Sequence, residues 1–224
     1  MNLLAIDTST DYLSIAIMRD GKICARHHKK ASRMHSTLLA PAIERLLKRA
    51  RVKLKDLDAL CISVGPGSFT GLRIGVTTVK AFAYALKKRI AAVPTLDVIA
   101  DHAKSFRGMV CPVLDARKGK VYACLYKSDG ENIKRVSPYM LLSADELASR
   151  IRAKKGRMAF LGDKSEEFIK NLPTNGPATI TQWHPRADVV ARLGLEYLRE
   201  GKTVTAAELE PLYIYSKECD ILGK

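Results

Sequence analysis

Four polar residues directly follow the first apolar run of the chain. Asp7, Thr8, Ser9 and Thr10 come after residues 3–6, so a carboxylate and three hydroxyls stand where a strand would end. Hydroxyls and backbone N–H groups can hold a phosphate, and a carboxylate can hold a hydrated metal ion. The same residue types are typical of a turn that satisfies its own backbone. Spacing alone favours the turn and leaves a phosphate site as the alternative.

Residues 65–75, here called the glycine segment, carry four glycines in the order Gly-Pro-Gly-Ser-Phe-Thr-Gly-Leu-Arg-Ile-Gly. Glycines between a strand and a helix permit positive φ and close backbone approach, and the helix N-terminus could bind an anion. The Gly-Lys-Ser/Thr ending of a P-loop is missing. Gly71 and Gly75 share one helical face, where another helix could approach closely. Anion binding and close packing both remain open.

Side chains that could ligate a metal or act as nucleophiles are scattered along the sequence. His27 and His28 are neighbours in an expected strand, so they point to opposite faces, and the other three histidines are isolated. Asp97 and Asp101 fit a solvated helix face. We therefore predict neither a catalytic residue nor a metal site. The five cysteines include no C-x-x-C pair, which favours free thiols in a reducing compartment.

The composition is that of a folded protein with a strongly basic surface. Of the 224 residues, 47% are hydrophobic, and the net charge is +15. Residues 1–104 carry a net +10 and residues 105–224 a net +5. This charge fits a polyanionic partner as well as ordinary solvated surfaces. The first apolar run is too short for a signal peptide, and no run of about 18 apolar residues exists, so we expect a cytoplasmic protein.

The elements that would position the polar residues form a recognisable order in the first half. Apolar patterns predict strands at residues 3–6, 13–18 and 23–25, with a hairpin turn at Asp20-Gly21. Helical spacing then predicts a helix over residues 35–50, capped by Ser36 or Thr37. A strand at 60–64, a helix at 71–87 and a strand at 90–93 complete a β-β-β-α-β-α-β order.

The second half is a variation on this theme. We predict strands at residues 110–115, 121–126, 133–139 and 158–161, helices at 143–152, 165–171 and 188–199, and an extended tail at 212–216. Ser143 and Glu146 form a capping-box pattern. We place the first lobe at residues 1–104 and the second at 105–224, with the last segment packing back on the first lobe.

Several motifs together resemble one family. Residues 64–75 are very similar to the signature of the TsaB (YeaZ) family. Ile6-Asp7-Thr8-Ser9 resembles the start of that family, residues 114–122 its second-lobe motif, and Glu210-Pro211-Leu212-Tyr213 its C-terminal motif. The matches follow the family order over nearly the whole chain.

The resemblance implies a fold and a role. The fold would be the two-lobed α/β fold of actin, sugar kinases and the heat-shock chaperone ATPase (ASKHA, ribonuclease H-like), which agrees with the predicted order of elements. The role would be that of a non-catalytic partner in tRNA modification. The catalytic paralog TsaD, with the ATPase TsaE, would transfer a threonylcarbamoyl group from threonylcarbamoyl-adenylate to N6 of the adenosine adjacent to the anticodon, in tRNAs reading A-starting codons. Family members also carry glycoprotease (M22) names, but no peptidase centre is visible.

One departure from the catalytic paralog supports the partner role. That paralog carries a metal-binding His-x-x-x-His motif, and the resemblance places Thr95 and Ile99 at the two histidine positions. Isoleucine cannot ligate a metal, and a lone threonine is a poor ligand. His102 lies three residues out of register.

The resemblance also implies where partners would bind. The contact with the catalytic subunit, or with a second copy in a homodimer, would lie on the helices at residues 35–50 and 71–87. The candidate interface residues are Leu39, Ile43, Gly71, Ile74, Gly75, Thr78 and Phe82. No cofactor of its own is expected, although ATP or ADP could bind at the interface of the complex. The candidate nucleotide- or phosphate-binding residues are Asp7, Ser9, Thr10, Gly65 and Gly67.

Two further hypotheses come from the fold and from the charge. The first is a nucleotide-binding phosphotransferase or ATPase that uses Asp7, although the second lobe lacks the glycine pair of an adenosine pocket. The second is direct contact with tRNA, for which the candidates are Arg45, Lys48, Arg49, Lys87, Lys88 and Arg89.

Overall fold

The computed structural model describes residues 1–152, 154, 156–163 and 176–214. It divides into two compact units. Unit 1 comprises Met1–Val98 and Pro185–Leu212, and unit 2 comprises Ile99–His184 and Tyr213–Lys224. The first stretch of unit 1 therefore ends at residue 98, where we had placed a boundary at 104. Residues 185–212, which we had placed in the second lobe, belong to unit 1.

Unit 1 is built on a five-stranded sheet with the order β3-β2-β1-β4-β5. Its strands are β1 (Asn2–Asp7), β2 (Tyr12–Arg19), β3 (Lys22–Lys30), β4 (Ala59–Ser63) and β5 (Arg89–Val93). The first three strands are antiparallel, and β4 and β5 run parallel to β1. Asp20 and Gly21 both have positive φ, 49° and 78°, as a tight hairpin turn between β2 and β3 requires.

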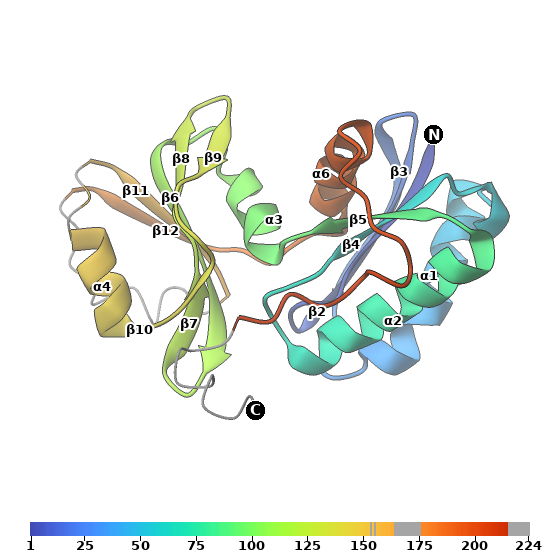
Figure 1. The fold of residues 1–224 in the computed structure, drawn as a ribbon, viewed down its shortest axis with the longest axis horizontal. Coiled ribbons are helices and arrows are strands. Elements are labelled where there is room, and N and C mark those ends of the chain that lie inside the picture. Colours follow the sequence, from blue (N-terminus) through green and yellow to red (C-terminus); the bar gives the residue numbers. More distant parts are fainter. Residues whose placement is uncertain (153, 155, 164–175, 215–224) are drawn as a thin grey trace. The chain divides into compact units, whose positions relative to one another are not determined.

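Helices cover both faces of this sheet (Figure 1). On one face lie α1 (His35–Ala50) and α2 (Phe69–Leu86), which pack on side chains such as Leu4 and Ile6 of β1. On the other face lies α6 (Ala187–Arg199), which packs on Leu3 and Ala5. Because β1 is buried on both sides, its sequence is continuously apolar rather than alternating.

The predicted boundaries of α1 and α2 are correct to within two residues, whereas the predicted N-cap of α1 is wrong. The helix α1 spans the predicted residues 35–50, but its N-cap is Met34, which makes no side-chain capping bond. Thr37 lies inside the helix, and its hydroxyl donates to the Met34 carbonyl at 3.1 Å. The helix α2 starts at Phe69, two residues earlier than predicted, because the Ser68 hydroxyl accepts a hydrogen bond from the Gly71 N–H at 3.3 Å.

Unit 2 contains a seven-stranded sheet. Its central path is β10-β7-β6-β11-β12, and β8 pairs with both β6 and β9. The strands are β6 (Arg107–Arg117), β7 (Lys120–Ala123), β8 (Tyr126–Asp129), β9 (Ile133–Arg135), β10 (Met140–Ser143), β11 (Met158–Gly162) and β12 (Ala178–Gln182). The helix α4 (Ala144–Arg152) has the predicted capping box: the Ser143 N–H donates to Glu146 at 2.7 Å and the Glu146 N–H to the Ser143 hydroxyl at 3.3 Å.

The sequence prediction merged strands that the structure separates. The predicted strand at 121–126 is β7 and β8, which pair with successive parts of β6 and are interrupted at Cys124-Leu125. Here the Leu125 N–H donates to the Ser137 hydroxyl at 2.8 Å instead of to a neighbouring strand. The predicted strand at 133–139 is likewise only β9, before the chain continues into β10.

Other elements fall outside the predictions or outside the described residues. The helix α3, absent from the predicted order of elements, spans Thr95–His102, and a 3-10 turn, η1, spans Leu54–Asp56. The spacing of Asp97 and Asp101 is helical as expected, but Asp101 is buried and not on a solvated face. The predicted helix at 165–171 and the end of the predicted tail at 215–216 lie outside the described residues.

Within the described ranges, four cysteines are free thiols. Burial raises the pKa of the Cys61 thiol to about 12, which agrees with its interpretation as a small apolar core residue. Searched over the same ranges, the chain shows no group of three or more His, Cys, Asp or Glu side chains placed to share a metal ion. None of the helices described is long and apolar enough to cross a membrane.

Candidate functional site

The glycine segment (residues 65–75) runs from the end of β4 into the second turn of α2. Its glycines lie against other segments of the same chain. A Cβ atom on Gly67 would lie 2.3 Å from the Ser9 carbonyl oxygen, and one on Gly71 would lie 2.1 Å from the Thr8 carbonyl oxygen. A Cβ on Gly75 would lie 2.3 Å from the Thr8 hydroxyl. Real Cβ atoms do not approach this closely, so three glycines are required for α2 to lie against the residues after β1.

The fourth glycine contacts a segment from the other end of unit 1. Gly65 has a φ of 114°, and a Cβ there would lie 2.8 Å from the Leu212 carbonyl oxygen. The Leu212 N–H donates to the Val64 carbonyl at 2.7 Å, and Lys80 of α2 donates to the Leu209 carbonyl at 3.0 Å. The C-terminal part of unit 1 therefore packs along β4 and α2.

Residues 7–10, here called the polar turn, use their polar groups within the protein. The Thr8 hydroxyl donates to the Gly71 carbonyl at 2.7 Å, and the Ser68 N–H donates to the Ser9 carbonyl at 2.7 Å. The Ser9 N–H and hydroxyl both donate to the same Asp7 oxygen, at 3.0 and 2.9 Å. The Thr10 hydroxyl accepts from the Tyr12 N–H at 3.3 Å. The bonds to Asp7 and Thr10 are those of the turn that spacing favoured, and the phosphate site stays a prediction.

Asp7 is fully buried at the carboxyl end of β1. Burial raises the pKa of its carboxyl group, while hydrogen bonds from Ser63 and Ser9 and the nearby His35 act in the opposite direction. Its Oδ1 atom receives both Ser9 bonds, and its Oδ2 atom has no well-formed hydrogen bond within the described residues. Burial of this carboxyl group therefore costs folding free energy, and the group is shielded from solvent in this conformation.

Thr95 occupies the first position where the catalytic paralog is expected to carry a metal-binding histidine. Its hydroxyl lies 2.8 Å from the Ser63 hydroxyl and accepts a hydrogen bond from the Gly65 N–H at 3.1 Å. Its own N–H donates to the Gly65 carbonyl at 2.8 Å. Thr95 therefore joins the start of α3 to the end of β4. Ile99 is fully buried and apolar, and His102 stacks on Trp183 with ring centroids 3.3 Å apart.

The candidate interface residues separate into two groups by burial. Leu39 and Ile43 belong to the core beneath α1 and are each 2% exposed, and Gly71 and Gly75 lie against Thr8. The second group is half-buried, comes from one flank of α2, and consists of Ile74, Thr78 and Phe82. A partner could reach this second group without opening the core, and the interface itself stays a prediction.

Sequence reasoning missed the residues on the outer face of α2. Phe69 and Tyr84 are 55% and 83% exposed, and the Arg73 guanidinium lies 3.9 Å from the centroid of the Phe69 ring. The 18-residue helix has no acidic residue and only two basic ones, Arg73 and Lys80. An outer helix face with exposed aromatic rings and little charge is typical of a protein contact. Helical spacing from the buried Val79 would have placed Tyr84 on this face.

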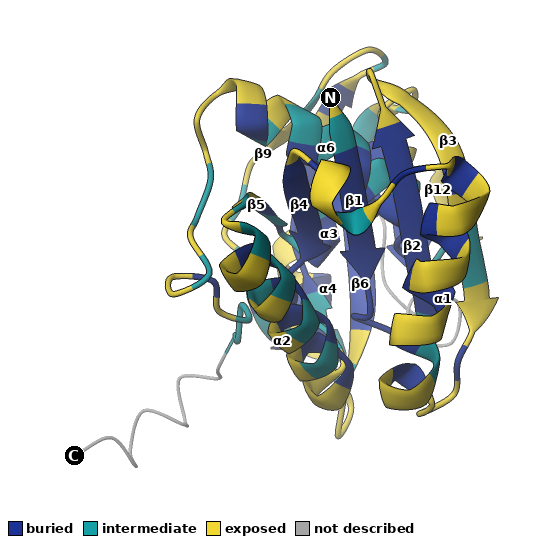
Figure 2. Cartoon of the chain, turned by 90° about the vertical axis from the view of Figure 1, so that its right-hand side faces the viewer, coloured by how far each residue is buried: buried dark blue, intermediate teal, exposed yellow. Residues whose placement is uncertain are grey.

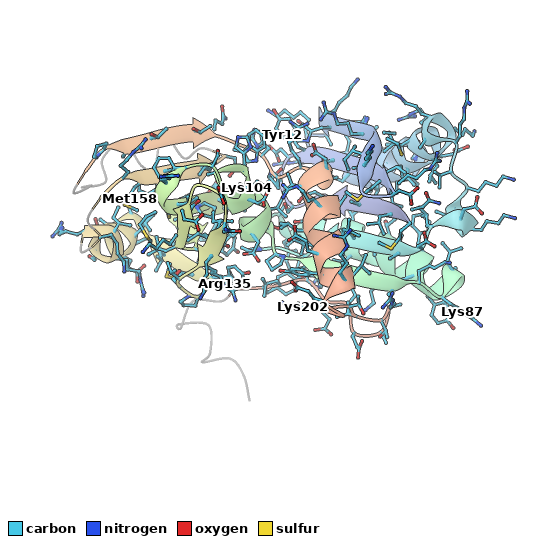
Figure 3. All side chains as sticks on the ribbon, turned by 90° about the horizontal axis from the view of Figure 1, so that it is seen from above. Tyr12, Lys87, Lys104, Arg135, Met158 and Lys202 are labelled. Carbon is cyan, nitrogen blue, oxygen red and sulfur yellow. The ribbon has the colours of Figure 1, made fainter. Side chains whose placement is uncertain are left out.

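The candidate tRNA-binding residues do not form a single cluster. Arg45, Lys48 and Arg49 lie on α1, beside the edge strand β3. Lys87, Lys88 and Arg89 lie between the end of α2 and β5, the opposite edge strand, and Figure 3 shows Lys87 projecting from this end of unit 1. Four inter-strand steps, roughly 19 Å, separate the two edges. The Lys48 ammonium is also paired with Glu44 at 2.6 Å.

Comparison with known protein sequences gives consistent matches over most of the chain. A family model described as TsaD, tRNA N6-adenosine threonylcarbamoyltransferase, matches residues 27–210. The tRNA threonylcarbamoyladenosine biosynthesis protein TsaB of Bacillus subtilis (strain 168) is 34% identical over 201 residues, which cover 88% of each chain. The protein of the same name from Escherichia coli (strain K12) is 29% identical and covers 96% of this chain and 94% of its own length.

Solved structures agree with these matches. YeaZ from Pseudomonas aeruginosa superposes with a TM-score of 0.83 at 26% identity, covering 95% of this chain and 99% of the other. A ROK family protein from Streptococcus pneumoniae, solved with sucrose, gives a TM-score of 0.51 at 11% identity, covering 90% and 100%. The second likeness concerns the fold alone, and it confirms the α/β, actin-like and sugar-kinase-like class expected from the sequence.

The close contact between α2 and the polar turn predicts an unequal response to alanine at two glycines. Overpacking costs roughly 1–3 kcal/mol, partly offset by the roughly 1 kcal/mol by which alanine is the better helix former. Gly71→Ala should destabilise more than Gly75→Ala, because its new Cβ meets the fixed Thr8 carbonyl rather than a side-chain hydroxyl. Urea denaturation would measure both, with the exposed Thr77→Ala as the control on the same helix.

Removal of the Thr8 hydroxyl should rescue only one of the two variants. Adding Thr8→Ala to Gly75→Ala removes the clashing atom, so the combined loss should be smaller than the sum by about 0.5 kcal/mol or more. The same addition to Gly71→Ala leaves the clashing carbonyl in place. Equal rescue of both variants, or none of either, would contradict this account of the contact.

The buried Asp7 predicts a pH dependence of stability. Because its folded pKa is raised, the protonated acid is favoured in the folded protein, and this contribution is lost as pH rises through the folded pKa. Asp7→Asn does not titrate. The stability of this variant relative to the parent protein should therefore increase with pH, starting from about pH 4, near the ordinary Asp pKa. Denaturation midpoints of both proteins across this range would show it, and parallel curves would refute it.

Proposed function

Because the chain belongs to the TsaB family of tRNA threonylcarbamoyladenosine biosynthesis proteins, we propose that it is the partner subunit that supports a separate catalytic subunit in this modification. The reaction is transfer of a threonylcarbamoyl group to N6 of the adenosine adjacent to the anticodon in tRNAs reading A-starting codons. The proposed partners are the catalytic paralog TsaD and the ATPase TsaE. The chain would have no independent turnover.

The observation that carries this proposal is the outer face of α2. Phe69 and Tyr84 are large, exposed and unaccompanied by acidic side chains, and Ile74, Thr78 and Phe82 form a half-buried ridge beside them. Figure 2 shows the outer sides of α1 and α2 exposed next to each other over one face of the sheet. Aromatic anchors of this kind dominate binding energy at protein interfaces. We propose that this surface binds the catalytic subunit, and a second copy of the chain when the protein is alone.

A second observation favours the role of partner subunit over that of catalytic subunit. The Thr95 hydroxyl is used for bonds to Ser63 and Gly65, and the Ile99 side chain is buried and apolar. Both positions, where the catalytic paralog is expected to hold a metal, thus have structural uses in this chain. Metal chemistry would then come from the partner subunit.

We further propose that the chain needs no cofactor of its own, and that any ATP or ADP binds at the interface of the assembled complex. The support is that the polar turn and the glycine segment pack closely and bond to each other, which uses the Thr8 hydroxyl and the Ser68 N–H within the protein. The alternative function, an ATPase using Asp7, gains no specific support, because that carboxylate is fully buried. A role on tRNA places the protein in the cytoplasm.

The proposed interface predicts the effect of a charge on α2. Phe69→Asp combined with Tyr84→Asp should weaken binding to the catalytic subunit of the same organism by roughly 30-fold or more, because loss of aromatic anchors commonly costs at least about 2 kcal/mol. Co-elution from a sizing column and titration would measure binding. Threonylcarbamoylation of tRNA by the reconstituted complex should fall in parallel.

The control is Val136→Asp, which places one such charge on another exposed apolar residue, in unit 2. This variant should bind and support modification like the parent chain. If the parent chain itself neither co-elutes with the catalytic subunit nor stimulates tRNA modification, the proposed function fails. If the α2 variant binds normally, the function stands but this surface is not the interface.

A further inference from the structure

The segment from β3 to the end of α1 is unusually basic. Residues 22–50 contain eight Lys and Arg residues and a single acidic residue, Glu44. Glu44 is occupied by Lys48, whose ammonium lies 2.6 Å from its carboxylate. Acidic residues within this segment therefore offset little of its positive charge.

The strand β3 places part of this charge beside α1. In its ladder with β2, His27 pairs with Ile15 and Lys29 with Leu13. Both of these β2 residues belong to the core beneath α1 and α2, so His27 and Lys29 lie on the α1 side of the sheet. The neighbouring Arg26 lies on the other side, where it approaches Asp188 of α6 at 3.5 Å.

The facing flank of α1 supplies the remaining charge. The helix α1, which carries Arg45, packs beside β3. In agreement, burial lowers the pKa of His27, and the charges of Lys29 and then Arg45 lower it further. Arg49 is one helical turn further along the same flank as Arg45. We call His27, Lys29, Arg45 and Arg49 the basic strip.

The basic strip differs from an ordinary solvated surface in how its charges are partnered. Across the part of the chain that the structure describes, Lys29, Arg45 and Arg49 make no ion pair with an acidic side chain. Charged residues on an edge strand also prevent pairing with other chains, and β3 is an edge strand. Protection of the edge does not account for Arg45 and Arg49, however, because these two residues lie on a helix that packs over the sheet.

The strip is also separate from the proposed protein interface. Arg45 and Arg49 project from the flank of α1 that faces β3, whereas α2 packs beside the other flank. The exposed aromatic residues Phe69 and Tyr84 lie on α2. The strip therefore lies apart from the exposed aromatic residues that anchor the proposed interface.

We propose that the basic strip binds the phosphate backbone of tRNA when the complex is assembled. This inference rests on the proposed function, because tRNA is the polyanion on which the proposed complex acts. Residues two apart on a strand and one turn apart on a helix are each spaced by roughly 6–7 Å, so the strip presents a short row of cations to a phosphate chain. Such contacts position an RNA without reading its sequence, and they weaken steeply with salt.

The test compares two double charge reversals in the assembled complex. Lys29→Glu with Arg45→Glu changes the strip, and Lys87→Glu with Lys88→Glu makes the same change of charge near β5, at the opposite edge of the sheet. Binding of unmodified tRNA would be measured at about 50 mM and about 200 mM salt. The strip variant should bind about 10-fold more weakly at the lower salt, with its log–log salt slope reduced by about 1.4–1.8, while the β5 variant changes little.

The possible results distinguish binding by the strip from a general effect of net charge and from failure of the proposed function. Equal weakening by both variants would overturn the inference, because net charge and not the strip would be responsible. Unchanged tRNA binding by a strip variant that still assembles would also overturn it, and so would lost affinity for a protein partner with tRNA affinity retained. Failure of the parent chain to assemble or to stimulate modification would instead contradict the proposed function. If charge reversal prevents folding, Lys29→Gln with Arg45→Gln gives the same comparison with a smaller expected loss.

Discussion

Unit 1 depends on the contact between the first turns of α2 and the polar turn that follows β1. Gly67, Gly71 and Gly75 have no side chains because the carbonyl groups of Ser9 and Thr8 and the Thr8 hydroxyl occupy the space. The Thr8 hydroxyl and the Ser68 N–H then form hydrogen bonds across this contact. The helix is thereby fixed in position and rotation, because its glycine face must meet the turn.

Fixing the rotation of α2 also decides what the helix presents to solvent. Once the glycine face points at the polar turn, helical geometry places Phe69 and Tyr84 on the outer side and Ile74, Thr78 and Phe82 on a flank. The segment that most strongly resembles the family signature thus lies beneath the surface that we propose as the protein interface. Its glycines allow the polar turn to pack directly against α2.

The carboxyl ends of β1 and β4 keep a polar cluster that a purely structural protein would not need. Asp7 is buried there at the cost of removing a carboxyl group from water, and Ser63 and Thr95 share hydrogen bonds near it. The Thr95 hydroxyl bonds to Ser63 and Gly65 and so joins the end of β4 to the start of α3. These polar side chains thus contribute hydrogen bonds that hold neighbouring elements of unit 1 together.

The sequence by itself determined the family, the order of strands and helices in the first half, and the capping box at Ser143, because these follow from local patterns of apolar spacing and side-chain chemistry. It left open which part of the chain packs against the glycine segment, because glycine spacing allows a close neighbour without naming it, and that neighbour is the polar turn at Thr8 and Ser9. It also missed the split of β7 from β8 and the assignment of α6 to unit 1. Only the tertiary structure decided these points, and it also placed Arg45 beside His27 and Arg89 at the far edge of the sheet. Their positions depend on contacts between residues far apart in the chain, which no local pattern contains.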